Sequence, residues 1–349
     1  MTSPHIHLVG SVPLGDTEAV LRTLGSKLGT HLKRMPDGET GKRTDWIRFI
    51  QVMLSQHPAL EIDKETPPLR WRQWDGVLLR EIPLVKFKDG IDLDRVTFEP
   101  GYAAAAIESF AVFDRLQREG TIAKGVKFQI CLPTPLAPTY NYVSPRAQAD
   151  FLRLFEAAMV REVGEIAARL PHDRIAVQWD VCQEVLMYEG FYPQRPRDYK
   201  EQIQSHFARI GAAVPRDIEL GYHLCYGSPR DEHILQPKDM AIMVEMTNGI
   251  FARATRPVDF IHLPVPHDRS DDAFFAPLKA LALPARTELI LGLIHPGDAA
   301  GNRARLEKAR ALKPIAGIGT ECGWGRKDPQ RVPALLESHL SLIEEASAP

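Results

Sequence analysis

Short apolar runs rich in β-branched residues alternate with longer helical patterns along this chain, and the alternation constrains the fold more than any other feature. Helical patterns separate most of the runs, and a last helical pattern follows the eighth run. The eight expected strands are His5–Ser11, Leu32–Asp37, Val126–Leu132, Arg174–Asp180, Ile218–Leu224, Val258–Leu263, Glu288–Ile294 and Ile315–Thr320. The expected helices are Asp16–Leu28, Tyr102–Glu119, Ser144–Leu170, Asp198–Ala213, Lys238–Ala254, Ala300–Ala311 and Pro329–Ala346.

Such alternation predicts a mostly parallel α/β sheet with right-handed crossovers. Eight repeats favour a closed (β/α)8 TIM barrel, which needs about 250 residues. The chain has 349 residues, and the surplus falls between the second and third strands. There Leu69–Gly90 has the pattern of a hairpin, so we expect one barrel domain over residues 1–349 with a hairpin-like insertion at about residues 50–100. An open doubly wound sheet is the alternative, although no GxGxxG follows the first strand.

Charge and composition exclude several classes of partner. Lys plus Arg number 43 and Asp plus Glu number 45, so the formal net charge is −2 and nothing favours nucleic acid. No apolar run is long enough to span a membrane, and the start of the sequence lacks the pattern of a signal peptide. Four cysteines are too few for a disulfide scaffold and fit a reducing compartment, so we expect a cytoplasmic protein. A homodimer is among the oligomeric states left open.

Polar and metal-binding residue types gather where the expected strands end, which is where barrel enzymes place their chemistry. They include Ser11, Glu39, Thr134, Asp180, Cys182, His223, Cys225, His262, His295 and Cys322. His223 and Cys225 are two residues apart on a strand and therefore point to the same face. Cys322 ends the last strand, across the mouth of a barrel. Imidazole and thiolate are ligands that suit zinc, and three protein ligands leave one position open, as in catalytic sites.

Seven short motifs, in order, resemble the catalytic C-terminal barrel of cobalamin-independent methionine synthase, in the superfamily that also holds uroporphyrinogen decarboxylase. Val9–Pro13 is similar to that family's Ile-Gly-Ser-Phe-Pro, and Asp37-Gly38-Glu39 with Arg43-Thr44-Asp45 to its His-Gly-Glu-x-x-Arg-Asn-Asp. The other five segments are Leu132–Pro135, Gln178–Asp180, His223–Tyr226, Ile294–Pro296 and Glu321–Gly323. The resemblance covers nearly the whole chain.

The resemblance implies roles for individual residues. His223, Cys225 and Cys322 would be zinc ligands. Ser11, Glu39 and Asp180 would hold the polar end of an amino-acid thiol, and Asp180 would also position the sulfur for reaction. The loop at Thr134 would face the pocket of the methyl donor, and His295 would donate a proton or steer the donor. Trp179 flanks the expected mouth, which makes it a further candidate for substrate contact.

This sequence departs from the family at the fourth ligand. Where the family has a glutamate after the sixth strand, Val258–Pro264 ends in proline, so His262 takes the place, or Glu245 reaches in, or the position is open. The loop at Thr134 also lacks the family pattern, which leaves open whether the donor is a folate or another methyl compound.

Three functions are consistent with these residues. The first is a zinc-dependent methyl or alkyl transferase that activates a small thiol, homocysteine-like or other, for attack on an alkyl donor. The second is a metal-independent lyase or decarboxylase on the same barrel, using Asp180 and arginines at the mouth. The third is a non-catalytic protein that binds small thiols or a cofactor.

Overall fold

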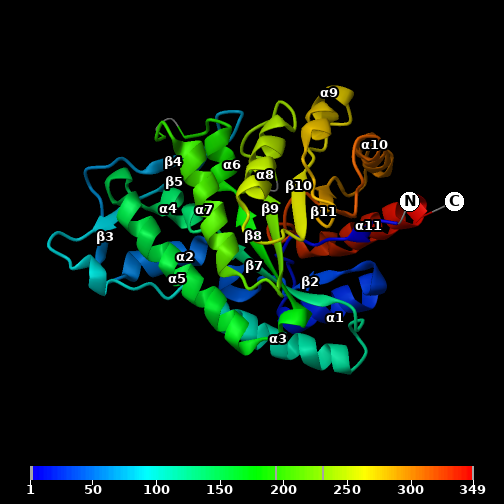
Figure 1. Cartoon of the computed structure of the whole chain (residues 1–349), viewed down its shortest axis with the longest axis horizontal. Coiled ribbons are helices and arrows are strands. Elements are labelled where there is room, and N and C mark those ends of the chain that lie inside the picture. The colour runs from blue at the N-terminus through cyan, green and yellow to red at the C-terminus, as the bar shows by residue number, and fades with distance from the viewer. Residues whose placement is uncertain (1–2, 193–194, 230–231, 348–349) are drawn as a thin grey trace.

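The computed structural model describes residues 3–192, 195–229 and 232–347, and its centre is a curled sheet of eight parallel strands (Figure 1). The strand order is β1-β12-β11-β10-β9-β8-β7-β2, so neighbours follow the order of the sequence. The strands are β1 (His5–Ile6), β2 (Arg34–Pro36), β7 (Lys127–Pro133), β8 (Ile175–Val181), β9 (Glu219–Leu224), β10 (Phe260–Pro264), β11 (Glu288–Gly292) and β12 (Gly317–Gly319). Each lies within or next to a run that the sequence predicts as a strand.

The two ends of this strand order meet. Ile6 pairs with Leu32 and Ser11 pairs with Gly38 through isolated parallel bridges, which join the chain around β1 to the chain around β2. A doubly wound sheet would reverse its strand order midway, and this sheet does not. The α/β fold is therefore consistent with a TIM-like barrel, and the open-sheet alternative is wrong.

Helices cover the outside of the curled sheet, as Figure 1 shows for α3, α5, α7 and α8. The long helices are α1 (Thr17–Leu28), α3 (Tyr102–Arg118), α5 (Gln148–Arg169), α7 (Tyr199–Ala213), α8 (Ala241–Arg253), α10 (Ala299–Arg310) and α11 (Val332–Ser347). The short ones are α2 (Arg48–Gln56), α4 (Leu136–Tyr142), α6 (Gln183–Tyr188) and α9 (Asp272–Phe275). All seven predicted helices are present. None of the helices in the described residues is long and apolar enough to cross a membrane.

Between β2 and β7 the chain forms two small antiparallel sheets in addition to helices α2 and α3. β3 (Leu60–Ile62) pairs with β6 (Val85–Phe87), and β4 (Leu69–Arg72) pairs with β5 (Leu78–Ile82). The hairpin predicted within Leu69–Gly90 is thus present. Gly76, in the turn between β4 and β5, has φ of 87°, which glycine adopts without steric cost.

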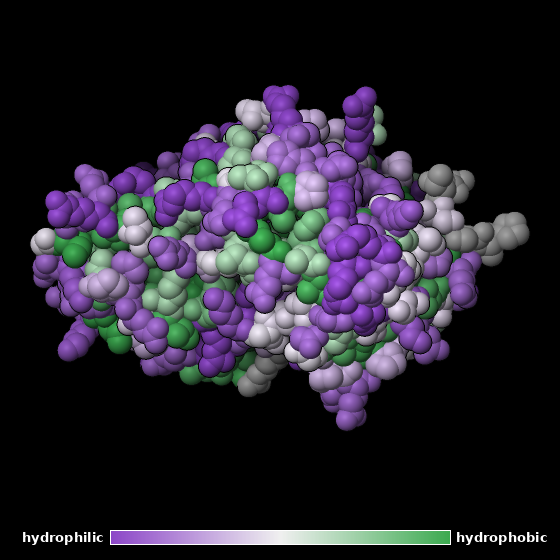
Figure 2. All heavy atoms as spheres, turned by 90° about the horizontal axis from the view of Figure 1, so that it is seen from below, coloured by the Kyte–Doolittle hydropathy of each residue, from purple (hydrophilic) through white to green (hydrophobic). Residues whose placement is uncertain are grey.

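Buried apolar side chains fill the space between sheet and helices, whereas polar side chains dominate the outside. Figure 2 shows one face on which charged and polar residues are spread between small groups of apolar ones. The amino-terminal end of the sheet contains an exception to the apolar interior. Arg34, which is 4 % exposed, donates to Glu219 at 2.6 Å and to Glu288 at 2.9 Å, so one cation joins β2, β9 and β11.

We expect Arg34→Met to lower the free energy of unfolding by about 3 kcal/mol, because it leaves two partly buried carboxylates without their shared cation. Urea unfolding measures the change. Arg22→Met is the matched control: Arg22 pairs with Glu18 on an exposed helical turn, and its loss should cost about 0.5 kcal/mol or less. Equal effects of the two substitutions would show that the Arg34 network does not hold the strands together.

Candidate metal centre and pocket

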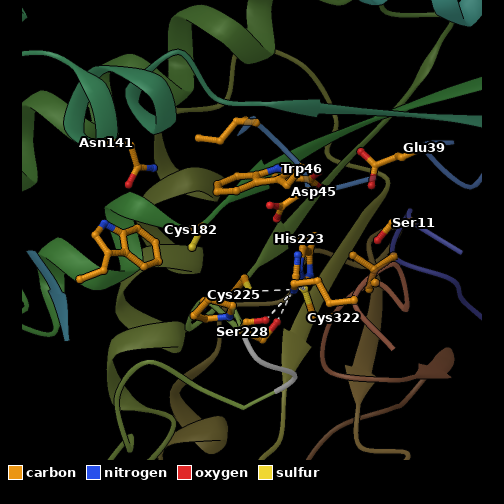
Figure 3. Close-up of a pocket in the computed structure, with 18 of the residues that line it drawn as sticks. Ser11, Glu39, Asp45, Trp46, Asn141, Cys182, His223, Cys225, Ser228 and Cys322 are labelled. Carbon is orange, nitrogen blue, oxygen red and sulfur yellow. Dashed lines mark hydrogen bonds between the residues drawn. The ribbon is translucent and has the colours of Figure 1, made fainter. Parts of the chain in front are cut away.

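A pocket lies at the carboxyl ends of the strands, where residues from five strand ends meet (Figure 3). Its lining includes residues in or just after β1, β2, β8, β9 and β12, namely Ser11, Glu39, Asp180, His223, Cys225 and Cys322. These residues are far apart in the sequence, and the curled parallel sheet brings them to one place. The pocket therefore occupies the position where the chemistry of barrel proteins is usually found.

His223, Cys225 and Cys322 form a compact cluster within this pocket. Their potential ligand atoms all lie within 4.8 Å of one another, and the two sulfurs are 3.7 Å apart. His223 is the next-to-last residue of β9, and the Cys225 N–H continues the pairing with β8 through the carbonyl of Val181. The alternation of a strand therefore points the imidazole and the first thiol the same way.

One nitrogen of His223 is free to bind a ligand. Its Nδ1 lies 2.8 Å from Nδ1 of His262, so one of these two nitrogens carries the shared proton. Its Nε2 is buried and has no hydrogen-bond partner among the described residues. A buried polar atom without a partner is costly, which suggests that a missing group binds there. One imidazole nitrogen and two sulfurs fit the donor preference of zinc.

The structure separates the candidates for a fourth ligand. His262, fully buried on β10, contacts the far nitrogen of His223 and lies outside the cluster, so it occupies the place of an orienting partner. Burial holds the pKa of His262 well below its ordinary value, so the ring is neutral and can accept the Nδ1 proton of His223. Glu245 lies on α8, where its exposed carboxylate pairs with Lys200 at 2.6 Å. The expectation that Glu245 reaches the site is corrected.

The two thiols differ in their readiness to lose a proton. A hydrogen bond from Cys225, with His223 and Arg326 nearby, holds the pKa of Cys322 well below its ordinary value. Contacts with Cys182 and Cys322, together with burial, raise the pKa of Cys225. Of the two thiols, Cys322 is therefore the readier to ionise, and a cation bound there would favour ionisation of both.

Two buried carboxylates face the pocket next to this cluster. Asp180 is fixed by Gln178, whose Nε2 donates to it at 2.8 Å. The carboxylate of Glu39 accepts no hydrogen bond from the described residues, and the residue has the left-handed φ of 48°. Burial, partly offset by Arg43, raises the pKa of Glu39 to about 7, and burial with the neighbouring Glu39 also raises the pKa of Asp180. An ionised pair here would attract a cationic group of a substrate.

Ser11 also lies where the sequence predicts. Its side-chain oxygen accepts from the N–H of Gly325 at 3.1 Å, and its carbonyl accepts from Trp324 at 2.7 Å. These bonds fix the loop that carries Cys322 against the end of β1.

Besides His262 and Glu245, three predicted site residues do not line the pocket. Trp179 is fully buried between Gln178 and Asp180, and because side chains alternate along a strand it points away from them, into the layer outside the sheet. Thr134 is also fully buried and lies against Glu184. His295 is engaged elsewhere: Nε2 lies 2.9 Å from the carbonyl of Val265, and Nδ1 lies 3.7 Å from Glu321. The direct roles expected for these residues are therefore not supported by their positions.

The remaining wall of the pocket comes from parts of the chain that sequence reasoning did not connect with the site. Trp46 has a left-handed φ of 47° and donates a hydrogen bond to Asp180. The hairpin β4–β5 and helix α4 complete this wall, with Trp71, Arg80, Ile82, Asn141 and Tyr142. Cys182 and Arg326 line the pocket too. Asp45, beside Trp46, lies within a recognised motif, and Cys182 was among the candidates at the strand ends, whereas the aromatic residues of this wall gave no signal in the sequence.

We expect Glu39→Gln to stabilise the protein more at pH 8 than at pH 5. The pKa of Glu39 rises from 4.5 to about 7 on folding, so its contribution to stability is lost as the pH rises through 7. At pH values above 8, the gain in the free energy of unfolding should reach up to about 3 kcal/mol. Thermal unfolding at both pH values measures it, with Glu61→Gln on exposed β3 as control. A gain that does not depend on pH would contradict the proposed burial of charge.

Comparison with known proteins agrees with the architecture. No family model and no curated protein matches the sequence. Among solved structures, a B12-independent methionine synthase from Shewanella sp. W3-18-1, in complex with selenomethionine, superposes with a TM-score of 0.65 at 13% identity, over 99% of this chain and 98% of that one. A Listeria monocytogenes protein assigned as a vitamin-B12-independent methionine synthase gives 0.60 at 14% identity, over the whole of both chains. The chain therefore shares the fold of these proteins over its full length.

Proposed function

We propose that this protein is a zinc-dependent methyl or alkyl transferase that uses a small thiol as acceptor. The observation that carries the proposal is the unpartnered, buried Nε2 of His223 beside the sulfurs of Cys225 and Cys322 in a pocket. These three residues would hold the metal, and the fourth position would face the pocket. A bound zinc ion lowers the pKa of a coordinated thiol and so supplies a thiolate at neutral pH.

The side chains of the pocket would suit a thiol acceptor that also carries a cationic group. Glu39 and Asp180 would bind an ammonium group, as in a homocysteine-like thiol, and Gln178 holds Asp180 in place for this. Ser11 would contact the same end of the acceptor. The fold shared with methionine synthases supports this substrate class.

The far wall of the pocket would receive the alkyl donor. Trp46, Trp71 and Tyr142 offer aromatic surface, and Arg80 is paired with Asp45 at 2.9 Å. Such a wall would accept a folate-type ring or a simpler methyl compound. Because His295 does not line the pocket, the proposal assigns it no part in protonating the leaving group.

A metal-independent lyase or decarboxylase has less support. It would need free arginines at the mouth, and both arginines of the lining are engaged, Arg80 with Asp45 and Arg326 with Ser228. A non-catalytic thiol-binding protein would share the metal cluster but would form no thioether when thiol and methyl donor are supplied together.

Purified protein should contain about one zinc ion per chain, and Cys225→Ser or Cys322→Ser should lose most of it, because each removes one of three ligands. Elemental analysis after dialysis against a chelator measures the content. Cys131→Ser is the matched control, since Cys131 is buried, donates to the carbonyl of Val9 and does not line the pocket. Purified wild-type protein without bound zinc would contradict the proposed function.

Adding homocysteine should change the metal's ligand set from two sulfurs to three. X-ray absorption at the zinc edge counts these sulfurs directly. A thiol that lacks the amino group, such as propanethiol, should bind more weakly because it cannot use Glu39 and Asp180. An unchanged count of two at saturating homocysteine would exclude this acceptor class.

A further inference from the structure

Both cysteine sulfurs of the cluster accept a hydrogen bond from an N–H group of the protein. The N–H of Gly227 lies 3.2 Å from Sγ of Cys225, and Nη2 of Arg326 lies 3.5 Å from Sγ of Cys322. These distances are ordinary for a sulfur acceptor. One donor belongs to the main chain and is neutral, whereas the other is a charged guanidinium group and makes the stronger kind of bond.

Arg326 is held in this position by a second loop. Its Nε donates to the carbonyl of Ser228 at 2.6 Å, and its Nη2 also donates to the hydroxyl of Ser228 at 2.8 Å. Ser228 follows Gly227, so the loop after β9 supplies one sulfur donor and anchors the other. Gly227 has φ of 72°, a left-handed conformation that places its N–H over Cys225 and that glycine adopts without strain.

These bonds matter because an alkyl transferase of this kind holds several sulfurs near one electrophile. In the wanted reaction the acceptor sulfur forms a bond to carbon, and the bond from carbon to the leaving group breaks with its electron pair on the leaving group. The same step at Cys322 would turn a ligand into a thioether, which is a poor zinc ligand. A donated hydrogen bond withdraws electron density from a thiolate and lowers its nucleophilicity.

The acceptor's sulfur would have no comparable protection. The carboxylates of Glu39 and Asp180 face the cluster from the acceptor's side, and they accept hydrogen bonds when ionised and do not donate them. Ser11 is assigned to the polar end of the acceptor and not to its sulfur. An acceptor thiolate would therefore be the most nucleophilic of the three sulfurs.

We propose that Arg326, held by Ser228, is a positioning residue that protects Cys322 from alkylation and so directs the alkyl group to the sulfur of the substrate. The inference rests on the proposed function, because it requires a metal held by both cysteines. It adds a selectivity role that the ligand set alone does not supply.

The test treats zinc-loaded protein with iodomethane in the absence of any thiol and measures methylation of Cys322 and Cys225 by peptide mass spectrometry. In Arg326→Met, methylation of Cys322 should become at least about threefold faster. Cys225 keeps its bond from Gly227 and serves as the control within the same site, so the ratio of the two rates should rise. Arg326→Lys, which keeps a cationic donor, should restore part of the protection.

Zinc content measured beforehand separates the two proposals. Wild-type protein without zinc removes the proposed function, whereas zinc-loaded Arg326→Met protein with the wild-type ratio of methylation overturns the role of Arg326 alone. If Arg326 had only a structural role, its loss would raise the methylation rates of Cys322 and Cys225 together. That result would also overturn the protective role of Arg326. If Arg326→Met does not retain zinc, the ratio is measured in Ser228→Ala, which removes one of the two anchors of Arg326, and there too an unchanged ratio contradicts the inference.

Discussion

The parallel pairing of β8, β9 and β10 is the constraint on which the site depends. Asp180 lies opposite His223, and His223 lies opposite His262, so one level across three strands holds a carboxylate, a candidate ligand and its orienting partner. A slip of one residue in either register would turn the His223 side chain to the other face of the sheet. The close approach of Phe260 to Gly221 helps to fix this register, since a Cβ at Gly221 would lie 2.2 Å from the Phe260 ring.

Among the described residues, buried charged groups are paired at one end of the sheet, and one is left without a hydrogen-bonding partner at the other. At the amino-terminal end, Arg34 pairs with Glu219 and Glu288, and the buried charges there are compensated. At the carboxyl end, the Glu39 carboxylate accepts no hydrogen bond from the described residues and the residue has a left-handed backbone. Compensated charge serves stability, whereas unpaired charge and backbone strain cost stability and are typical of sites that bind a ligand.

The sequence predicted those parts of the molecule that depend on local pattern. Strand and helix positions follow from periodicity, and ligand candidates such as His223 and Cys225 follow from their spacing at a strand end. Prediction from the sequence was wrong or incomplete where the direction of a side chain, or packing between distant segments, determines which residues line the pocket. Trp179 is next to Asp180 in the chain, yet the strand points it away from the pocket. Trp71, on a hairpin more than a hundred residues from Asp180, has no local feature that links it to the site.

The region between β2 and β7 shows that the candidate metal cluster and the opposite wall of the pocket depend on different parts of the fold. The cluster uses residues at strand ends, whose positions are fixed by a sheet with many hydrogen bonds. The opposite wall uses Trp46, with its strained backbone, and side chains of β4 and β5, which pair only with each other. Such a wall can change by substitution in a small hairpin without disturbing the barrel. Thiol activation would thus be set by the sheet, and the choice of alkyl donor by the hairpin.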